Sequence, residues 1–136
     1  MSSFKQWMTY GSILMLTIAS LTLAGCGSSK EITLGAKDNG TQIELEQGQT
    51  LAIALDSNPT TGYSWARDPA KADDVLVQVG EAEYKSQSKL VGGGGIETLR
   101  YRADAPGKTT LTLIYRRPWE EGAKPAQTYT LEVSVR

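Results

Sequence analysis

The sequence predicts an all-β fold, an antiparallel β-sandwich of seven to eight short strands in one domain over residues 31–136. Apolar residues alternate with polar ones in short segments, and no apolar pattern of helical period extends far enough to predict a long helix. Turn residues separate these segments at intervals of roughly 8–12 residues, which is typical of immunoglobulin-like sandwiches. The Cys…Trp…Cys pattern of antibody domains is absent from the chain. Only the sandwich architecture is therefore predicted. A small β-barrel is the alternative, because the strand pattern alone does not distinguish the two.

The N-terminal segment, residues 1–25, is interpreted as a lipoprotein signal peptide. Lys5 precedes an apolar run over residues 11–23, which is shorter than the ~20 residues that a transmembrane helix needs. The segment ends in Leu-Ala-Gly-Cys, which resembles a bacterial lipobox, and Cys26 is the only cysteine of the chain. Cys26 is therefore the predicted lipidation site, carrying palmitate or similar acyl chains. A plain secretory signal followed by a chance cysteine is the alternative.

The predicted lipid decides where the protein is expected to reside. Cys26 would become the N-terminus, residues 26–30 would form a short tether, and the acyl chains would be the contact with the membrane. The expected location is the cell envelope, either the outer membrane and periplasm or the cell surface. Gly27 does not resemble an inner-membrane retention signal, which favours the outer membrane. A thioether at Cys26 would offer neither a disulfide nor a nucleophile.

The first half of the domain is expected to contain four strands, at residues 31–34, 41–46, 51–55 and 63–66. In the third of these segments, Leu51, Ile53 and Leu55 fall on one face, because side chains alternate along a strand. The dipeptide Asn39-Gly40 lies between the first two segments and is the pair that most strongly favours a β-hairpin. These segments predict a succession of antiparallel neighbours.

The second half is expected to contain the remaining strands, at residues 75–79, 96–103, 108–115 and 128–135, with residues 81–85 continuing the edge formed by the first of them. In the first of these, Val75, Val77 and Val79 form the alternating apolar set. In the last, the expected inward set is Tyr129, Leu131, Val133 and Val135. A helical turn fits the polar residues 68–74, and long loops fill residues 86–95 and 116–126.

The composition argues against an enzyme and against several kinds of site. The chain contains no histidine, and its one cysteine is the predicted lipid carrier, so Ser-His-Asp catalysis, Cys-His catalysis and the usual zinc sites are excluded. The adjacent pair Asp73-Asp74 is interpreted as a solvated turn rather than a metal or acid–base site. A net charge of −1 without any basic block does not favour nucleic-acid binding. No catalytic residue, metal or cofactor is predicted.

The first of three conspicuous loops follows the strand at 51–55 and consists of Asn58, Pro59, Thr60, Thr61, Gly62 and Tyr63. Pro59 fixes its own φ and biases Asn58 towards extended geometry, while Gly62 permits a positive φ at the exit. The two threonines have no apolar reason to face inward. The segment is interpreted as a stiff loop that presents hydroxyls and backbone to a partner, and an ordinary turn is the alternative.

The second loop contains four consecutive glycines, which are Gly92, Gly93, Gly94 and Gly95. Such a run is costly to order, so it indicates either a disordered tip or a backbone that lies close against another chain.

The third loop contains Arg117, Pro118 and Trp119. Trp and Arg are frequent anchors of protein interfaces. The alternative is that Trp119 folds back over one end of the core.

In a sandwich these three loops can gather at one end and form a protein-binding edge. Their sequences, Asn-Pro-Thr-Thr-Gly-aromatic, Gly-x-Gly-Gly and Arg-Pro-Trp, resemble in this order the motifs of the chagasin-type inhibitors of cysteine peptidases. The resemblance spans residues 32–135, which is nearly the whole domain. Gly93 fills the variable position of the glycine motif, which suggests a looser loop, and a lipid anchor is common only among bacterial members.

The resemblance implies a reversible, tight-binding inhibitor that is a monomer, needs no cofactor and occludes the active-site cleft of a papain-like cysteine peptidase. The tip with Thr60 and Thr61 would cover the catalytic cysteine of the peptidase. The glycines at 92–95 would pair with the non-primed side of the cleft through backbone hydrogen bonds. Trp119, with its two neighbours, would pack on the primed side. The alternative is a lipid-anchored immunoglobulin-like module for surface adhesion or structure.

Overall fold

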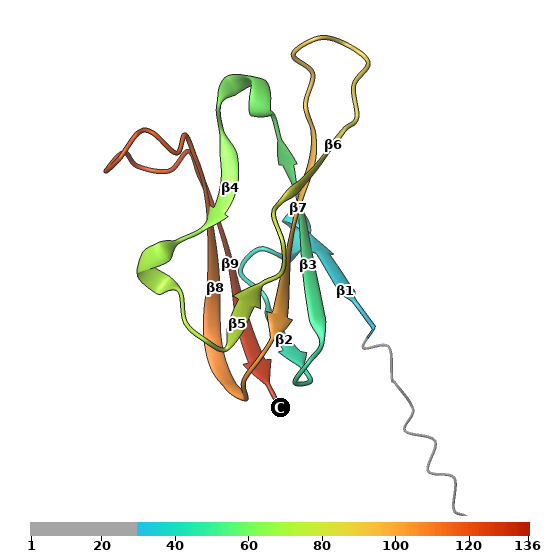
Figure 1. The fold of residues 1–136 in the computed structure, drawn as a ribbon, viewed down its shortest axis with the longest axis vertical. Helices are drawn as coiled ribbons and strands as arrows, with labels where there is room; N and C mark the ends of the chain where they lie inside the picture. Colours follow the sequence, from blue (N-terminus) through green and yellow to red (C-terminus); the bar gives the residue numbers. More distant parts are fainter. Residues whose placement is uncertain (1–29) are drawn as a thin grey trace, which may run out of the picture.

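Two β-sheets pack face to face in the computed structural model, which describes residues 30–136 (Figure 1). The predicted signal peptide at 1–25, the lipidation site Cys26 and most of the tether at 26–30 lie outside the described residues. Within residues 30–136, no helix is long and apolar enough to cross a membrane. The strands form two separate sheets, so the predicted sandwich is confirmed and the alternative of a small barrel is wrong.

The described chain contains nine strands, one or two more than expected. The five-stranded sheet has the order β1-β3-β7-β5, with β6 also on β7, and its strands are β1 (Ile32–Gly35), β3 (Thr50–Ser57), β5 (Leu76–Gln78), β6 (Glu83–Ser86) and β7 (Gly95–Ala103). The four-stranded sheet has the order β2-β9-β8-β4, and its strands are β2 (Gln42–Leu45), β4 (Ser64–Arg67), β8 (Gly107–Arg116) and β9 (Gln127–Val135). Three short 3₁₀ helices join some of them within the described residues: η1 (Ala36–Asp38), η2 (Pro59–Thr61) and η3 (Pro69–Lys71).

The sandwich is not purely antiparallel, which corrects the prediction. Strand β1 pairs in parallel with β3, and β2 pairs in parallel with β9. The hairpin expected at Asn39-Gly40 does not form. Asn39 has φ −56° and ψ 130° and Gly40 has φ 79°, which is a type II turn, whereas the favoured hairpin turn needs positive φ at both residues. The turn therefore carries the chain from one sheet to the other.

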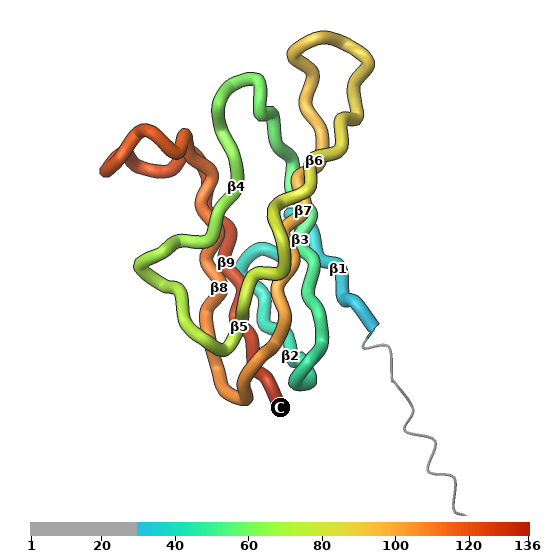
Figure 2. Tube along the Cα trace, in the orientation of Figure 1, coloured from blue at the N-terminus to red at the C-terminus, as the bar shows by residue number. Residues whose placement is uncertain are grey.

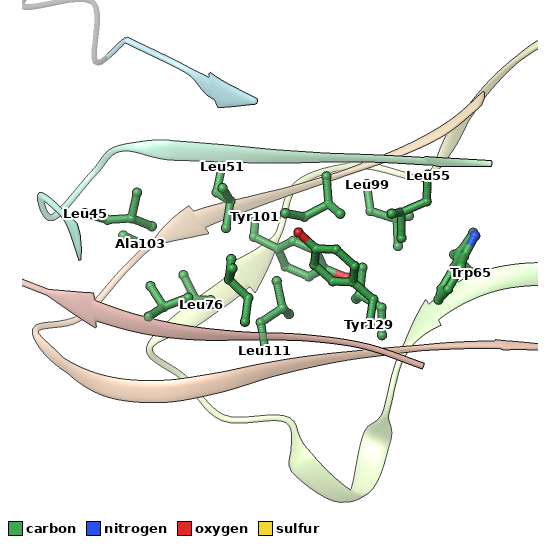
Figure 3. Close-up of a cluster of buried hydrophobic side chains, with 14 of the residues drawn as sticks. Leu45, Leu51, Leu55, Trp65, Leu76, Leu99, Tyr101, Ala103, Leu111 and Tyr129 are labelled. Atoms are coloured by element: carbon green, nitrogen blue, oxygen red, sulfur yellow. The ribbon is translucent and has the colours of Figure 1, made fainter. Parts of the chain in front are cut away.

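The core lies between the two sheets and consists largely of the alternating residues that the sequence predicts. The sets on β3 and β9 are buried as expected, with Leu51 and Ile53 fully enclosed. Figure 3 shows the cluster with Trp65 at one end, Leu45 at the other, and the rings of Tyr101 and Tyr129 near its middle. This core holds the strand ends from which the loops emerge.

The alternating set Val75, Val77 and Val79 does not form one buried face, because only Val75 packs against the core. Leu76 is fully buried, whereas Val77 and Val79 are more than a third exposed. The carboxylate of Asp73 accepts hydrogen bonds from the backbone N–H groups of Val75 and Leu76, and this sets the register of β5. A shift of one residue reverses both faces of a strand, and a three-residue strand has too few side chains to outweigh such an anchor.

Asp73 is therefore more than part of a solvated turn. It also pairs with Arg67 at 3.3 Å and accepts a hydrogen bond from the Thr109 hydroxyl. Partial burial raises the pKa of Asp73, but the hydrogen bonds from Thr109, Val75 and Leu76, together with Arg67, outweigh it and hold that pKa below 3.8. Within the described residues no group of three or more metal-binding side chains includes it.

Replacing Tyr101 by Phe is expected to leave stability unchanged or raise it by up to about 1 kcal/mol, because its buried hydroxyl has no hydrogen-bond partner in residues 30–136.

Burial raises the pKa of Tyr101 to about 12 from its usual 10.0, and does the same for Tyr129. The unfolded chain thus loses these protons first, so stability is complete below pH 10 and falls towards pH 12. Urea unfolding at pH 8 and 11 checks this; an unchanged alkaline loss in the Tyr101→Phe, Tyr129→Phe double variant would contradict it.

Candidate functional site

Three loops lie at the same end of the sandwich, away from the C-terminus (Figure 2). The threonine loop (residues 58–63) joins β3 to β4, the glycine loop (residues 87–94) joins β6 to β7, and the tryptophan loop (residues 117–126) joins β8 to β9. Figure 1 shows all three extending beyond the ends of the strands. The gathering of loops expected from the sequence is therefore present, and the loops form a protruding edge rather than a hollow.

The threonine loop is a single turn of 3₁₀ helix that Asn58 holds at both ends. The Asn58 side-chain oxygen accepts hydrogen bonds from the backbone N–H of Thr60 at 3.3 Å and from its hydroxyl at 2.6 Å. The Thr61 hydroxyl donates to the Asn58 carbonyl at 2.6 Å. Gly62 ends the turn with φ 82°, as expected. Both hydroxyl protons are thus bonded within the loop, so the threonines stiffen it, and both residues remain exposed at its surface.

Arg117 connects the tryptophan loop to the threonine loop. Its Nε donates a 3.0 Å hydrogen bond to the Thr61 carbonyl, and its guanidinium lies over the Tyr63 ring, 4.7 Å from the centroid. A 3.2 Å ion pair with Glu120 also holds the guanidinium. Arg117 therefore holds the tryptophan loop against the threonine loop. Its guanidinium is already bonded within this chain and is not free to bind a partner.

Three packed aromatic rings support the contact between these two loops. The Tyr115 ring on β8 packs between Tyr63 and Trp65, with centroids 5.2 and 5.0 Å away. The Tyr115 hydroxyl accepts a 2.9 Å hydrogen bond from the backbone N–H of Asn58. The base of the threonine loop is thus attached to the four-stranded sheet, although β3 belongs to the other sheet.

Trp119 is the large exposed side chain of this edge, with 67% of its surface accessible. Its ring lies against Gly62, so that a Cβ at residue 62 would stand only 2.3 Å from the ring carbon Cη2. The alternative in which Trp119 covers the core end is therefore wrong. The ring instead extends the surface of the threonine loop, and Pro118 beside it is also exposed.

The glycine loop is packed closely at its base. A Cβ at Gly95 would lie 2.2 Å from the Lys85 carbonyl oxygen, and one at Gly93 would lie 2.2 Å from the Ser88 Cβ. The looser loop expected from Gly93 is therefore wrong at this position. Gly94 is exposed, and Gly92, which has φ 79°, accepts a 3.0 Å hydrogen bond at its carbonyl from the Asn58 amide.

Two exposed apolar residues at the tip of the glycine loop were not among the predicted site residues. Leu90 is 79% exposed and Val91 is fully exposed. Two adjacent apolar side chains in a polar loop are a usable sequence signal, because alternation with buried positions cannot account for them. Together with Trp119 they place apolar surface on both sides of the threonine loop.

The edge is suited to inserting into another protein rather than to holding a small molecule. An open surface cavity of about 540 Å³ lies elsewhere, on the four-stranded sheet beside Lys71, Lys108 and Glu132. Within residues 30–136 no cluster of acidic side chains could hold a metal ion. The edge itself combines a bonded tip, exposed glycine backbone and exposed apolar side chains.

Sequence comparison shows that the similarity to known proteins extends beyond the three loops to most of the domain. A family model described as chagasin family peptidase inhibitor I42 matches residues 44–133. The chain belongs to this chagasin family. It is 32% identical over 104 residues to amoebiasin-1 of Entamoeba histolytica, covering 76% of this chain and 99% of that protein. It is 29% identical over 96 residues to chagasin of Trypanosoma cruzi, covering 68% and 87%.

The family fold agrees with the observed sandwich. The crystal structure of the cysteine protease inhibitor EhICP2 from Entamoeba histolytica superposes with a TM-score of 0.66 and 28% identity, over 78% of this chain and 96% of that one. The nine described strands thus form the immunoglobulin-like chagasin fold. The family consists of peptidase inhibitors, and all three loops lie inside the matched region.

Proposed function

We propose that this chain is a reversible, tight-binding inhibitor of papain-like cysteine peptidases and that its three loops occlude the active-site cleft. The observation that carries this proposal is the joining of the loops into one edge. Asn58 bonds the threonine loop to Gly92, and Arg117 bonds it to the tryptophan loop. A wedge held together in this way loses little conformational entropy on binding.

The threonine tip is proposed to lie over the catalytic cysteine of the peptidase without being cleaved. A peptide in a protease cleft is extended, whereas Pro59, Thr60 and Thr61 form a 3₁₀ turn closed by the Gly62 N–H to Pro59 carbonyl bond of 2.9 Å. Cleavage would need this turn to open against the hydrogen bonds to Asn58. The inhibitor therefore needs no chemistry of its own.

The flanking loops are proposed to provide most of the affinity. Residues 92–94 would pair through backbone groups on the non-primed side, with Leu90 and Val91 contributing apolar contact. Gly95, which the resemblance includes, is buried in β7 between Ser57 and Ser86 and is therefore left out of this pairing. Trp119 and Pro118 would pack on the primed side. An interface of roughly 1,600 Å² is standard for inhibitors that hold their shape.

We also propose that Cys26 carries the lipid and that the domain is anchored in the cell envelope. The proposal rests on the Leu-Ala-Gly-Cys sequence and on the position of the only cysteine. Mass spectrometry of the mature protein should find an acylated N-terminal Cys26. A mature chain with an unmodified cysteine would reject the anchor and leave the inhibitor proposal unchanged.

Titration of papain with the purified chain tests the inhibitor proposal. The expected result is a stoichiometric loss of activity that is recovered on dilution or competition with substrate. An unrelated immunoglobulin-like domain at the same concentration serves as the control. No inhibition of papain or of a cathepsin L-type enzyme at micromolar inhibitor would instead favour the lipid-anchored binding module.

A further inference from the structure

A buried carboxylate lies directly beneath the threonine loop. Glu97 is on β7, is only 5% exposed and points into the sandwich between the sheets. It accepts a 2.7 Å hydrogen bond from the Ser57 hydroxyl and bonds of 3.2 and 3.3 Å from the backbone N–H of Trp65. No ion pair of the described chain includes Glu97.

The two hydrogen-bond partners of Glu97 lie on the two strands that flank the threonine loop. Ser57 is the last residue of β3, and Trp65 is the second residue of β4. These strands belong to different sheets and share no backbone hydrogen bonds, so the sheets themselves do not set the distance between the two ends. The carboxylate spans this gap together with two other contacts: the Trp65 indole N–H donates to the Asp56 carbonyl at 2.9 Å, and the Tyr115 hydroxyl accepts from the Asn58 N–H at 2.9 Å.

Stability alone does not explain a carboxylate at this position. Its paired residues on the neighbouring strands are Leu55 on β3 and Tyr84 on β6, and the next inward residue on β7 is Leu99. Leu55 and Leu99 are buried apolar side chains. A buried charge without a cation carries a desolvation cost, and an apolar side chain of similar volume often stabilises such a site equally well or better. What the carboxylate adds is a fixed acceptor for two donors, the Ser57 hydroxyl and the Trp65 backbone N–H.

We propose that Glu97 is a positioning residue for inhibition, which sets the separation of Ser57 and Trp65 and thereby places the threonine tip relative to Trp119. This inference rests on the proposed function for its effect on affinity. Its structural part, the ordering of the threonine loop by Glu97, stands independently of any peptidase.

Three variants of the full-length chain separate positioning from general support of the fold. Glu97→Leu removes the acceptor and keeps the volume. Glu97→Gln keeps an oxygen for Trp65 and an amide that can pair with the Ser57 hydroxyl. Leu45→Ala destabilises the opposite end of the core, far from the loops (Figure 3).

The expected result is that Glu97→Leu raises the inhibition constant for papain at least about tenfold, while Glu97→Gln stays within about threefold of the parent. Leu45→Ala should lower Tm and leave the inhibition constant unchanged. Hydrogen exchange supplies the second readout, because the amides of Thr61 and Gly62 donate within the loop. Their protection should fall in Glu97→Leu and persist in Leu45→Ala.

The proposal is overturned if Glu97→Leu inhibits as tightly as the parent with unchanged exchange, or if Leu45→Ala weakens inhibition equally. Should Glu97→Leu fail to fold, Ser57→Ala removes one contact only; about a threefold loss is expected, and none would overturn the proposal. If the parent itself does not inhibit papain, the proposed function fails, and the exchange of Thr61 and Gly62 still decides whether Glu97 positions the loop.

Discussion

Replacing Trp119 by Ala is expected to weaken papain inhibition by roughly 30- to 700-fold, corresponding to about 2–4 kcal/mol of binding free energy. The ring is 67% exposed in the free protein, so its surface is available for burial against a partner. It rests on Gly62, which limits its freedom before binding. Aromatic side chains that are exposed and already ordered before binding are typical hot spots of protein interfaces.

The measurement pairs inhibition constants with thermal unfolding. Trp119→Ala should leave Tm nearly unchanged, because little of the ring is buried. Val77→Ala is the matched control, since this exposed apolar residue lies on β5 and outside the three loops. A variant at Trp119 that unfolds readily yet inhibits normally would show that the ring serves the fold instead.

Replacing Gly62 by Ala is expected to weaken inhibition by about tenfold or more, for a steric reason. The added Cβ would stand 2.3 Å from the Trp119 ring, so the ring or the turn has to move. The backbone φ of 82° adds strain of roughly 1–2 kcal/mol for a residue with a side chain. Both effects displace the tip from the tryptophan loop.

Gly40→Ala is the matched control for this variant. Gly40 has nearly the same φ, 79°, and a Cβ there would have no atom within 4 Å. Both variants should lose a similar amount of stability, and only Gly62→Ala should lose affinity. In the Trp119→Ala background the affinity cost of Gly62→Ala should shrink. Equal inhibition by Gly62→Ala and Gly40→Ala would contradict the coupling of the two loops.

The site was predictable in its parts and not in its internal bonding. The motifs identified the three loops, and Pro59 and Gly62 predicted a stiff turn, which is present. The sequence did not show that Asn58 uses both threonine hydroxyls or that Arg117 binds the Thr61 carbonyl, 56 positions away. These contacts depend on which loops the sheets bring together.

Glu97 shows the same limit inside the core. By alternation it lies on the inward face of β7 with Leu99 and Tyr101, where a carboxylate is unexpected. Its donors come from Ser57 and Trp65, on two other strands. No local pattern around residue 97 reveals these partners.

The sequence by itself determined the long strands, the inward faces of β3 and β9, and the three loops, because these follow from alternation and turn chemistry within a few residues. Only the tertiary structure decided the parallel pairing of β1 with β3 and of β2 with β9, the face that β5 buries, and the exposed position of Trp119 against Gly62. The physical reason is that short edge strands and loops contain too few side chains to select their own partners. Contacts from distant residues, such as those of Asp73 and Arg117, make that selection.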